Sequence, residues 1–355
     1  MARKKIEMKA EAVEKEEKKE DKVNQRFPDS PSSNRKMEDK ESSKLSDLPG
    51  IGPAAVEKLE AAGIFDLMGV AVLGPKELSD ISGLGESVAR KAIQASRKMM
   101  DLGFQDGLEF SEKRKEIYYI TTGSKELDNL LGGRGIETKA ITEAFGAYGS
   151  GKTQVGLTLA VNVQLPLEKG GVEGKAVYID SEGTFRPERI KQIANSKGLN
   201  SESVLKNIFV ARAFNSDHQI LLIDKIGELI KNGEPIRLVI IDSLTAHFRA
   251  EFSGRGQLAD RQQKLNRYLH NLMKMSEQFN LAIYVTNQVM ANPAMLFGDP
   301  TTAIGGNIVG HASTFRLYFR KSKKNSRVAK LIDSPNLPDN ECIFFVKEKG
   351  VCDEE

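Results

Sequence analysis

The sequence predicts an α/β protein with a small all-α domain in front of a larger core. Two observations predict the core. From Ile117 onward, β-branched runs alternate with helical stretches, and one strand–loop–helix junction carries the pattern G-x-x-x-x-G-K-[ST]. The small domain is predicted by short amphipathic segments, between Leu45 and Gly103, that pairs of glycines separate. At 355 residues, the chain is long enough for two or three domains.

Composition restricts the class of protein. Hydrophobic residues make up 39% of the chain, and no apolar run approaches the roughly 20 residues that cross a bilayer. The Lys-rich N-terminus lacks the apolar stretch of a secretory signal, and two cysteines, Cys342 and Cys352, are too few for a disulfide framework. We therefore expect a reduced, cytoplasmic protein without membrane contact. Because the net charge is only +3, contact with nucleic acid requires local basic clusters.

The first part of the chain divides into a tail and a helical domain. Residues 1–44 alternate Lys and Glu and then turn to Asn, Pro and Ser, so we expect a disordered charged tail. Residues 45–103 contain two similar glycine segments, at 48–52 and 81–85, and each opens a helix. Exposed amides at a helix N-terminus can hold a phosphate, so we expect a helix-hairpin-helix domain that contacts the DNA backbone. Tight turns in a small helical bundle are the alternative.

The core strands follow from the β-branched runs. Four runs are separated by helical stretches, which indicates βαβ units and a mainly parallel sheet; they span residues 140–145, 176–180, 238–242 and 281–288. Three later runs have no helix between them, so we expect an antiparallel extension at the sheet edge; they span residues 314–319, 328–333 and 342–346.

The glycine-rich junction predicts a phosphate-binding loop. It reads Gly146, Ala147, Tyr148, Gly149, Ser150, Gly151, Lys152 and Thr153. Glycines allow successive amides to point at phosphate oxygens, Lys152 can reach the β and γ phosphates, and Thr153 can ligate magnesium. ATP and Mg²⁺ are therefore the expected cofactors. A simple glycine-rich turn is the alternative.

Two acidic residues are expected beside this loop. Asp242 ends a strand that is otherwise apolar, which is typical of a Walker B strand and predicts a place in the magnesium shell. Glu182 follows the strand at residues 176–180 and could activate water as a general base. For Glu182, a helix cap or a surface carboxylate is an equally good interpretation from position alone.

Several segments together resemble the RecA/RadA recombinase family, from about Leu45 to the C-terminus. The most specific are residues 145–154, 177–189, 253–263 and 304–313. The resemblance implies a linker at residues 104–116 and a RecA-like ATPase core at residues 117–355. It also implies a DNA-dependent ATPase that forms filaments on single-stranded DNA and exchanges strands with a homologous duplex in recombination and repair.

The resemblance implies roles for individual residues. Glu182 resembles the catalytic glutamate, assisted by Lys152, and Gln288 the glutamine that senses the γ-phosphate. Arg189 resembles the arginine that packs on adenine. His311, Asp333 and Pro338 would contact the nucleotide that is bound by a neighbouring subunit. Two segments, the first after Arg249 and the second after Val289, resemble the family's two DNA-binding loops. DNA would be contacted by Arg249, Arg255, Arg261, Gly305, Gly306 and Asn307. Basic residues do cluster at 249–267 and 314–331, although a solvated face is the alternative for either cluster alone.

The resemblance also implies how subunits assemble. Phe104 matches the aromatic anchor of the family's Phe-x-x-Ala polymerisation motif, but Gly107 stands where the motif has alanine. Loss of one methyl could weaken the contact by roughly 1 kcal/mol. The expected partners are single- and double-stranded DNA, further copies of the chain in a helical filament or ring, and recombination mediators. A hexameric RecA-fold helicase, a non-catalytic mediator and a regulatory ATPase without a DNA role stay open as alternatives.

Overall fold

The structure, a computed structural model, describes residues 44–62, 64, 66–100, 104–252, 254–291 and 301–354. All of the predicted tail except Lys44 lies outside these ranges, as do residues 292–300 in the second predicted DNA segment. No helix in the described ranges is long and apolar enough to cross a membrane.

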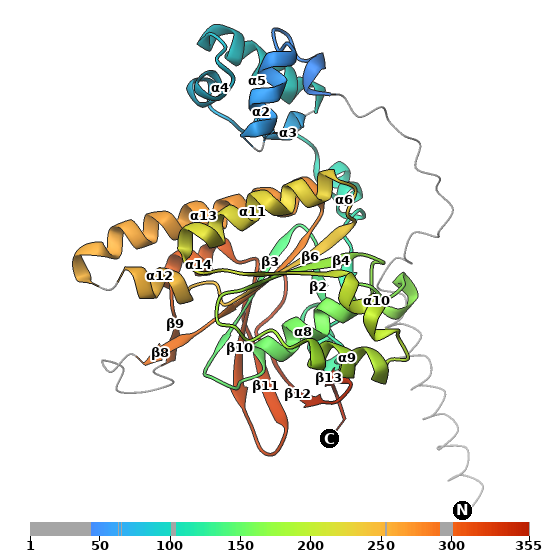
Figure 1. The fold of residues 1–355 in the computed structure, drawn as a ribbon. Coiled ribbons are helices and arrows are strands. Elements are labelled where there is room, and N and C mark those ends of the chain that lie inside the picture. Colours follow the sequence, from blue (N-terminus) through green and yellow to red (C-terminus); the bar gives the residue numbers. More distant parts are fainter. Residues whose placement is uncertain are drawn as a thin grey trace, which may run out of the picture.

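The small domain consists of short helices around an apolar core of its own (Figure 1). Its helices are η1 (Leu45–Asp47), α2 (Pro53–Ala61), α3 (Leu67–Ala71), α4 (Pro75–Ser82) and α5 (Glu86–Met99). Gly50 and Gly83 have left-handed φ angles of 81° and 74°, and a Cβ at Gly50 would lie 2.4 Å from a methyl of Val88. The turn before α2 therefore requires glycine.

The linker contains one short helix, α6 (Gly107–Arg114), which follows Phe104 in the chain. The side chain of Phe104 is fully exposed. Asp106 caps this helix, because its carboxylate accepts the Glu109 N–H at 2.8 Å. Gly107 is the first residue of α6, and a Cβ there would meet nothing within 4 Å. The glycine in the polymerisation segment is thus not required by packing within the described part of this chain.

The core is built on a sheet that, within the described residues, has nine strands in the order β13-β12-β11-β10-β3-β7-β6-β4-β5. Its parallel strands are β3 (Ala140–Gly146), β4 (Lys175–Asp180), β5 (Ile208–Arg212), β6 (Ile236–Asp242), β7 (Ala282–Asn287) and β10 (Phe315–Lys321). The antiparallel extension consists of β11 (Ser326–Asp333), β12 (Glu341–Lys347) and β13 (Gly350–Cys352). The predicted α/β class is confirmed.

Two features of the sheet differ from the expectation. β10 pairs parallel with β3, because α14 (Gly306–Ala312) carries the chain back before β10 begins, so only its other edge pairs antiparallel. The sequence analysis did not predict β5, which forms the sheet edge beyond β4. Small two-stranded pairs flank the sheet: β1 (Tyr119–Ile120) with β2 (Ile136–Glu137), and β8 (Val289–Ala291) with β9 (Thr301–Ala303).

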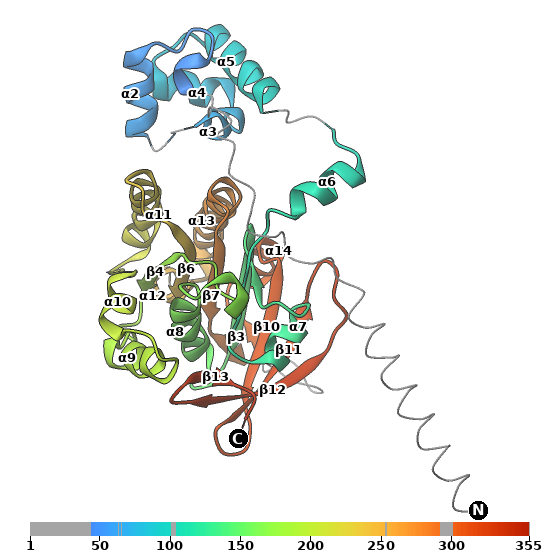
Figure 2. The same cartoon turned by 90° about the vertical axis from the view of Figure 1, so that its right-hand side faces the viewer.

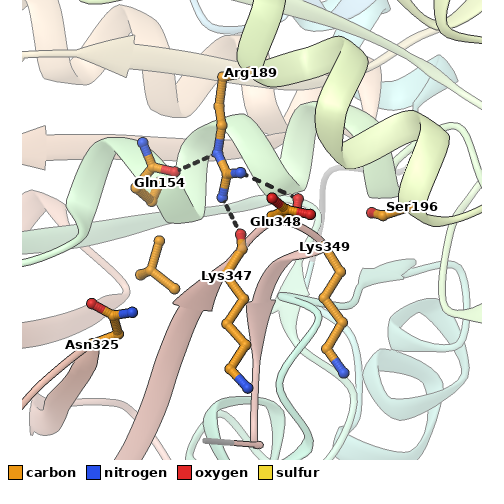
Figure 3. A pocket seen from close by; sticks show the side chains of 8 residues that line it. Gln154, Arg189, Ser196, Asn325, Lys347, Glu348 and Lys349 are labelled. Carbon is orange, nitrogen blue, oxygen red and sulfur yellow. Dashed lines mark hydrogen bonds between the residues drawn. The ribbon is translucent and has the colours of Figure 1, made fainter.

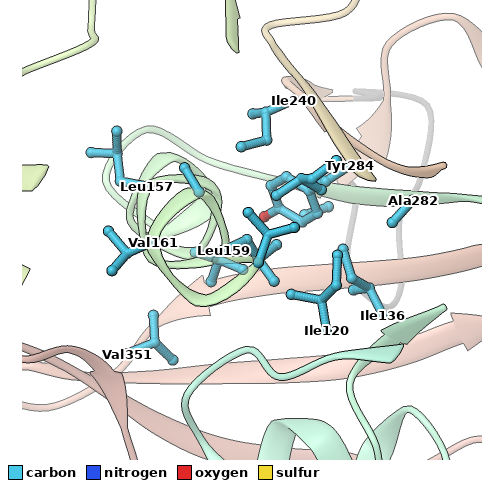
Figure 4. Packing of buried hydrophobic residues seen from close by; sticks show 14 of the residues in the cluster. Ile120, Ile136, Leu157, Leu159, Val161, Ile240, Ala282, Tyr284 and Val351 are labelled. Atoms are coloured by element: carbon cyan, nitrogen blue, oxygen red, sulfur yellow. The ribbon is translucent and has the colours of Figure 1, made fainter. Parts of the chain in front are cut away.

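Alternate strand residues enter two apolar cores, one on each face of the sheet. Ile240 and Tyr284 pack with α8 (Lys152–Asn162) on one face (Figure 4), whereas Ile241 and Val285 pack on the other. The first face is also covered by α7 (Lys125–Leu130), α9 (Pro187–Ser196) and α10 (Ser201–Lys206), near η2 (Leu167–Lys169). The second is covered by α11 (Ser216–Lys231), α12 (Ala246–Glu251), α13 (Leu258–Phe279) and α14, with η3 (Arg255–Gln257) before α13 (Figures 1 and 2).

Candidate nucleotide-binding site and adjoining loops

The predicted phosphate loop joins β3 to α8. Gly146, Gly149 and Gly151 have φ angles of 156°, 72° and 106°. A Cβ at Gly146 would lie 2.1 Å from the carbonyl oxygen of Phe319, so no larger residue fits there without moving β10. The glycines therefore allow the loop to lie tightly against the sheet, with the N-terminus of α8 at its end.

Lys152 begins α8 and folds back over the loop. Its ammonium donates to the carbonyl oxygens of Gly146 at 2.7 Å and Ala147 at 3.1 Å. Burial lowers the pKa of Lys152, while the carboxylates of Asp242 and Glu182 act in the opposite direction. The ammonium thus lies within the loop that is predicted to surround a phosphate chain.

Asp242 ends β6 with its carboxylate buried, 3% of the residue being exposed. Hydroxyl groups from three neighbouring segments donate to it: Tyr178 of β4 at 2.8 Å, Thr184 at 3.3 Å, and Thr286 of β7. A buried carboxylate held in this way is fixed in direction. The sequence analysis missed these partners, although polar residues near the ends of apolar strands are a signal that could have found them.

The residues present fit a magnesium ion bound together with nucleotide phosphates. The half-buried Thr153 lies in the first turn of α8, and Asp242 lies at the end of a central strand. No group of three His, Cys, Asp or Glu side chains in the described ranges could hold a metal by itself. Magnesium commonly takes only one or two protein oxygens and completes its shell with water and substrate phosphates. Thr153 and Asp242 are the residues that could supply those oxygens.

Glu182 and Gln288 come together although the chain separates them by 106 positions. The Gln288 side-chain amide donates to a carboxylate oxygen of Glu182 at 2.6 Å. Glu182 follows β4 and Gln288 follows β7, so both lie at the carboxyl edge of the parallel strands. The structure therefore joins the candidate general base to the candidate sensor.

The loop that carries Glu182 is held by Asp180. One carboxylate oxygen of Asp180 accepts the N–H groups of Glu182, Gly183 and Thr184 at 3.1, 2.6 and 3.1 Å, and the other accepts that of Phe185 at 3.1 Å. A carboxylate that accepts several backbone N–H groups imposes one conformation on the loop. The sequence analysis did not single out Asp180.

Arg189 lies in a pocket of about 780 Å³ that is also lined by Gln154, in the first turn of α8, and by residues 346–349 (Figure 3). Its guanidinium donates to the Gln154 side chain at 2.8 Å and to the Glu348 carbonyl at 3.2 Å. Burial lowers the pKa of Arg189. These bonds hold the guanidinium in a fixed plane beside α8, which suits stacking on a flat ring. Gln154, which orients it, was not among the predicted site residues.

Three predicted nucleotide contacts lie apart from this loop. His311 is on α14, Asp333 ends β11, and Pro338 follows it; all three are exposed. In the described ranges, no hydrogen bond or ion pair links any of them to residues 146–153. The structure thus leaves them available to a second subunit, and it does not bring them to their own chain's phosphate loop.

The candidate DNA contacts follow two neighbouring strands. Arg249 is exposed on α12, which follows β6, and Arg261 is half-buried on α13. The backbone of Arg255 lies in η3, but its side chain lies outside what the structure describes. Gly305 and Gly306 open α14 with φ angles of 97° and 58°. The exposed Asn307 follows them, behind the β8–β9 pair that extends from β7.

Fold and site together define a protein of the P-loop nucleotide-binding class, with a parallel core sheet and a helical N-terminal domain. The profile of the Rad51 family matches residues 113–354, and that of the SAM-like helix-hairpin-helix tandem matches residues 42–98. The chain is 50% identical over 311 residues to the DNA repair and recombination protein RadA of Aeropyrum pernix, an alignment that covers 88% of this chain and 97% of the relative. The chain therefore belongs to the Rad51 family. The family resemblance and the tandem helix-hairpin-helix domain inferred from the sequence are confirmed.

Proposed function

We propose that this protein is an ATP-dependent recombinase that assembles as a filament on single-stranded DNA and exchanges strands with a homologous duplex. The contact between Glu182 and Gln288 carries the proposal, because it joins the site of hydrolysis to the segment that begins at Val289. The relative in Aeropyrum pernix, named for DNA repair and recombination, supports the same assignment.

The nucleotide part of the proposal rests on the residues around the phosphate loop. The backbone amides of residues 146–153 and the Lys152 ammonium would neutralise the phosphate chain. Magnesium, held by Thr153 and Asp242, would supply further positive charge to the phosphate oxygens. Glu182 would accept the proton of the attacking water, and Arg189 would stack on the adenine.

Filament assembly is supported by two exposed apolar features. Phe104 is fully exposed in the linker. The edge strand β5 also presents apolar side chains to solvent, since Val210 is 46% exposed and Phe214, just beyond the strand, is 74% exposed. A strand edge that is unpaired within the described residues and carries apolar side chains is a ready binding surface for an extended segment of another chain. In such an assembly, Phe104 of one subunit would anchor beside β5 of the next.

DNA binding is supported by the arrangement of two regions. The glycine turns before α2 and α5 place helix N-termini where they can hold phosphates without reading bases. In the core, the segments after β6 and β7 carry Arg249, Arg261 and the glycines of α14. Because β6 and β7 are adjacent, both segments leave the same edge of the sheet and could follow one DNA backbone.

A strand-exchange assay tests this function. Circular single-stranded DNA and a homologous linear duplex are incubated with the protein, ATP and magnesium, and nicked circular product is measured on a gel. We expect product with the homologous duplex and none with a heterologous duplex of equal length. If the protein instead unwinds the duplex without exchanging strands, and forms closed rings in electron micrographs, it is a helicase. Hydrolysis that no DNA stimulates would identify a regulatory ATPase.

A further inference from the structure

Asn287 is a fully buried side chain whose amide joins three parts of the core. It ends β7 and directly precedes Gln288. Its nitrogen donates to the carboxylate of Glu143 at 2.8 Å and to the carbonyl oxygen of Ile304 at 2.6 Å. Its oxygen accepts the hydroxyl of Thr245 at 2.8 Å. Both N–H groups and the carbonyl of this amide are therefore used.

Each of these three partners lies next to a different functional segment: one of the two candidate DNA segments or the phosphate loop. Ile304 directly follows β9, and its own N–H donates to the Gln288 carbonyl at 3.0 Å, so residues 287–288 and 304 close the base of the second candidate DNA loop. Thr245 is the residue before α12, where the first candidate DNA segment begins. Glu143 lies in β3, three residues before Gly146 of the phosphate loop.

The charge of Glu143 makes this junction stiff. Glu143 is fully buried and pairs with Arg316 of β10 at 2.8 Å, while the Arg316 guanidinium lies 5.2 Å from the centre of the Phe145 ring. A buried ion pair contributes little net stability, but it is costly to leave half-paired and so holds its hydrogen-bonding partners in one arrangement. Glu143 therefore gives Asn287 a fixed reference point on β3.

We propose that Asn287 is a positioning residue that couples the nucleotide to DNA by holding the bases of both DNA segments to the strand that leads into the phosphate loop. This inference rests on the proposed function. If a bound nucleotide moves Gln288 away from Glu182, the adjacent Asn287 must move with it. Because Asn287 is hydrogen-bonded to Ile304 and Thr245, the bases of both DNA segments then move as well. DNA that moves either segment acts back on the nucleotide edge by the same route.

The test replaces Asn287 by alanine and compares it with a matched control, Asn162→Ala. Asn162, the last residue of α8, is equally buried, but its amide donates to the carbonyl oxygen of Thr121 and, within the described residues, forms no hydrogen bond with either DNA segment. Hydrolysis is measured with and without oligo(dT), and the affinity for fluorescein-labelled oligo(dT) is measured with and without a non-hydrolysable ATP analogue. Thermal midpoints show how far each variant is destabilised.

For Asn287→Ala we expect DNA-independent hydrolysis within about twofold of wild type and a stimulation by DNA that falls about 3- to 30-fold. The tightening of DNA binding by the ATP analogue falls by a similar factor, since a coupling between two binding sites is reciprocal. Asn162→Ala keeps both couplings at a lower thermal midpoint. Wild-type coupling in Asn287→Ala, or equal loss in Asn162→Ala, overturns the proposal.

Thr245→Val is the second variant, and it carries the test if Asn287→Ala does not fold. It removes one hydroxyl donor to Asn287 and keeps the shape of the side chain. We expect a partial loss of DNA stimulation in Thr245→Val alone. Where Asn287→Ala also folds, the two losses should not add in the double variant, because both act at one junction. Additive losses, or none in Thr245→Val, contradict the inference. If DNA does not stimulate hydrolysis by the wild-type protein, the proposed function itself is wrong. If DNA stimulates the wild type and the variants equally, only the role of Asn287 is wrong.

Discussion

At the scale of single residues, Lys152 is the simplest test of the nucleotide site. Its ammonium lies within hydrogen-bonding distance of the loop carbonyls. A hydrogen bond to a charged group contributes about 1.5–3 kcal/mol, so Lys152→Ala should weaken ATP binding by about 10- to 100-fold. Titration with a fluorescent ATP analogue measures this, with Lys169→Ala in η2 as a control lysine. Unchanged affinity in Lys152→Ala would show that phosphates bind elsewhere.

Glu182 can be tested without disturbing nucleotide binding. In Glu182→Gln the side-chain oxygen that accepts from Gln288 is retained, but the proton acceptor is lost. We expect near-normal ATP affinity and hydrolysis slowed by about 100-fold or more, as for removal of a general base. Glu188→Gln, an exposed carboxylate in the first turn of α9, is the matched control and should hydrolyse ATP normally. Equal rates in the two variants would remove Glu182 from catalysis.

At the scale of elements, the loop after β4 depends on one carboxylate. Both carboxylate oxygens of Asp180 accept backbone N–H groups. In Asp180→Asn, the side-chain NH₂ would face a backbone N–H, so two hydrogen-bond donors would oppose each other. The loop should then move and carry Glu182 with it. Because a misplacement of about 1 Å can cost roughly 100-fold in rate, we expect hydrolysis to fall by about 10- to 100-fold with a smaller change in ATP affinity. Steady-state kinetics separate the two, and normal turnover would show that Asp180 does not position the loop.

The start of α13 offers a second test at this scale. Arg261 has no carboxylate partner among the described residues, whereas Lys264 already pairs with Asp217 at 2.8 Å. Arg261→Ala should therefore weaken DNA binding with little dependence on sequence, and the slope of log affinity against log salt should fall by about one ion. Lys264→Ala should change the slope less. Fluorescence anisotropy over a salt series measures both, and an unchanged slope in Arg261→Ala would assign Arg261 to structure.

At the scale of the whole molecule, the proposed filament predicts that the nucleotide site is completed by residues of a neighbouring subunit. Truncating an aromatic anchor at an interface often costs about 2 kcal/mol or more, and a buried unpaired carboxylate costs more still. Phe104→Glu should therefore give a folded monomer or small oligomer that binds ATP but loses DNA-stimulated hydrolysis. The loss follows because, within the described ranges, no hydrogen bond or ion pair joins His311, Asp333 or Pro338 to the phosphate loop of their own chain, whereas a second subunit could bring them to it. Phe110→Glu, at an aromatic 58% exposed on α6, is the control.

Light scattering and electron microscopy with ATP and single-stranded DNA distinguish the two variants. Long regular filaments from Phe104→Glu would show that Phe104 is not the polymerisation anchor. Failure of both variants to assemble would place the contact on the linker as a whole. The replacement Gly107→Ala adds the methyl for which α6 leaves open space, and we expect it to favour assembly slightly.

Local pattern was enough to predict much of this protein. The glycines of residues 146–153 predict a phosphate loop because glycine, which has no Cβ, adopts the positive φ angles observed at Gly149 and Gly151 without steric cost. Asp242 was predictable because parallel strands bring their carboxyl ends to one edge. The two glycine turns of the helical domain were predictable for the same local reason, and their repetition distinguished them from ordinary turns.

The remaining features depend on contacts that no local pattern contains. Residues 208–211 of β5 are apolar, but a run of four does not by itself distinguish a strand from a helical segment. Only the tertiary structure placed this strand at the sheet edge beyond β4. Asn287 meets Glu143 across 144 positions, and Arg316 meets Glu143 across 173. By itself, the sequence determined the class of fold, the phosphate loop and the strand that bears Asp242. Only the tertiary structure decided which polar side chains are buried together, because such pairing depends on the order in which distant strands lie side by side.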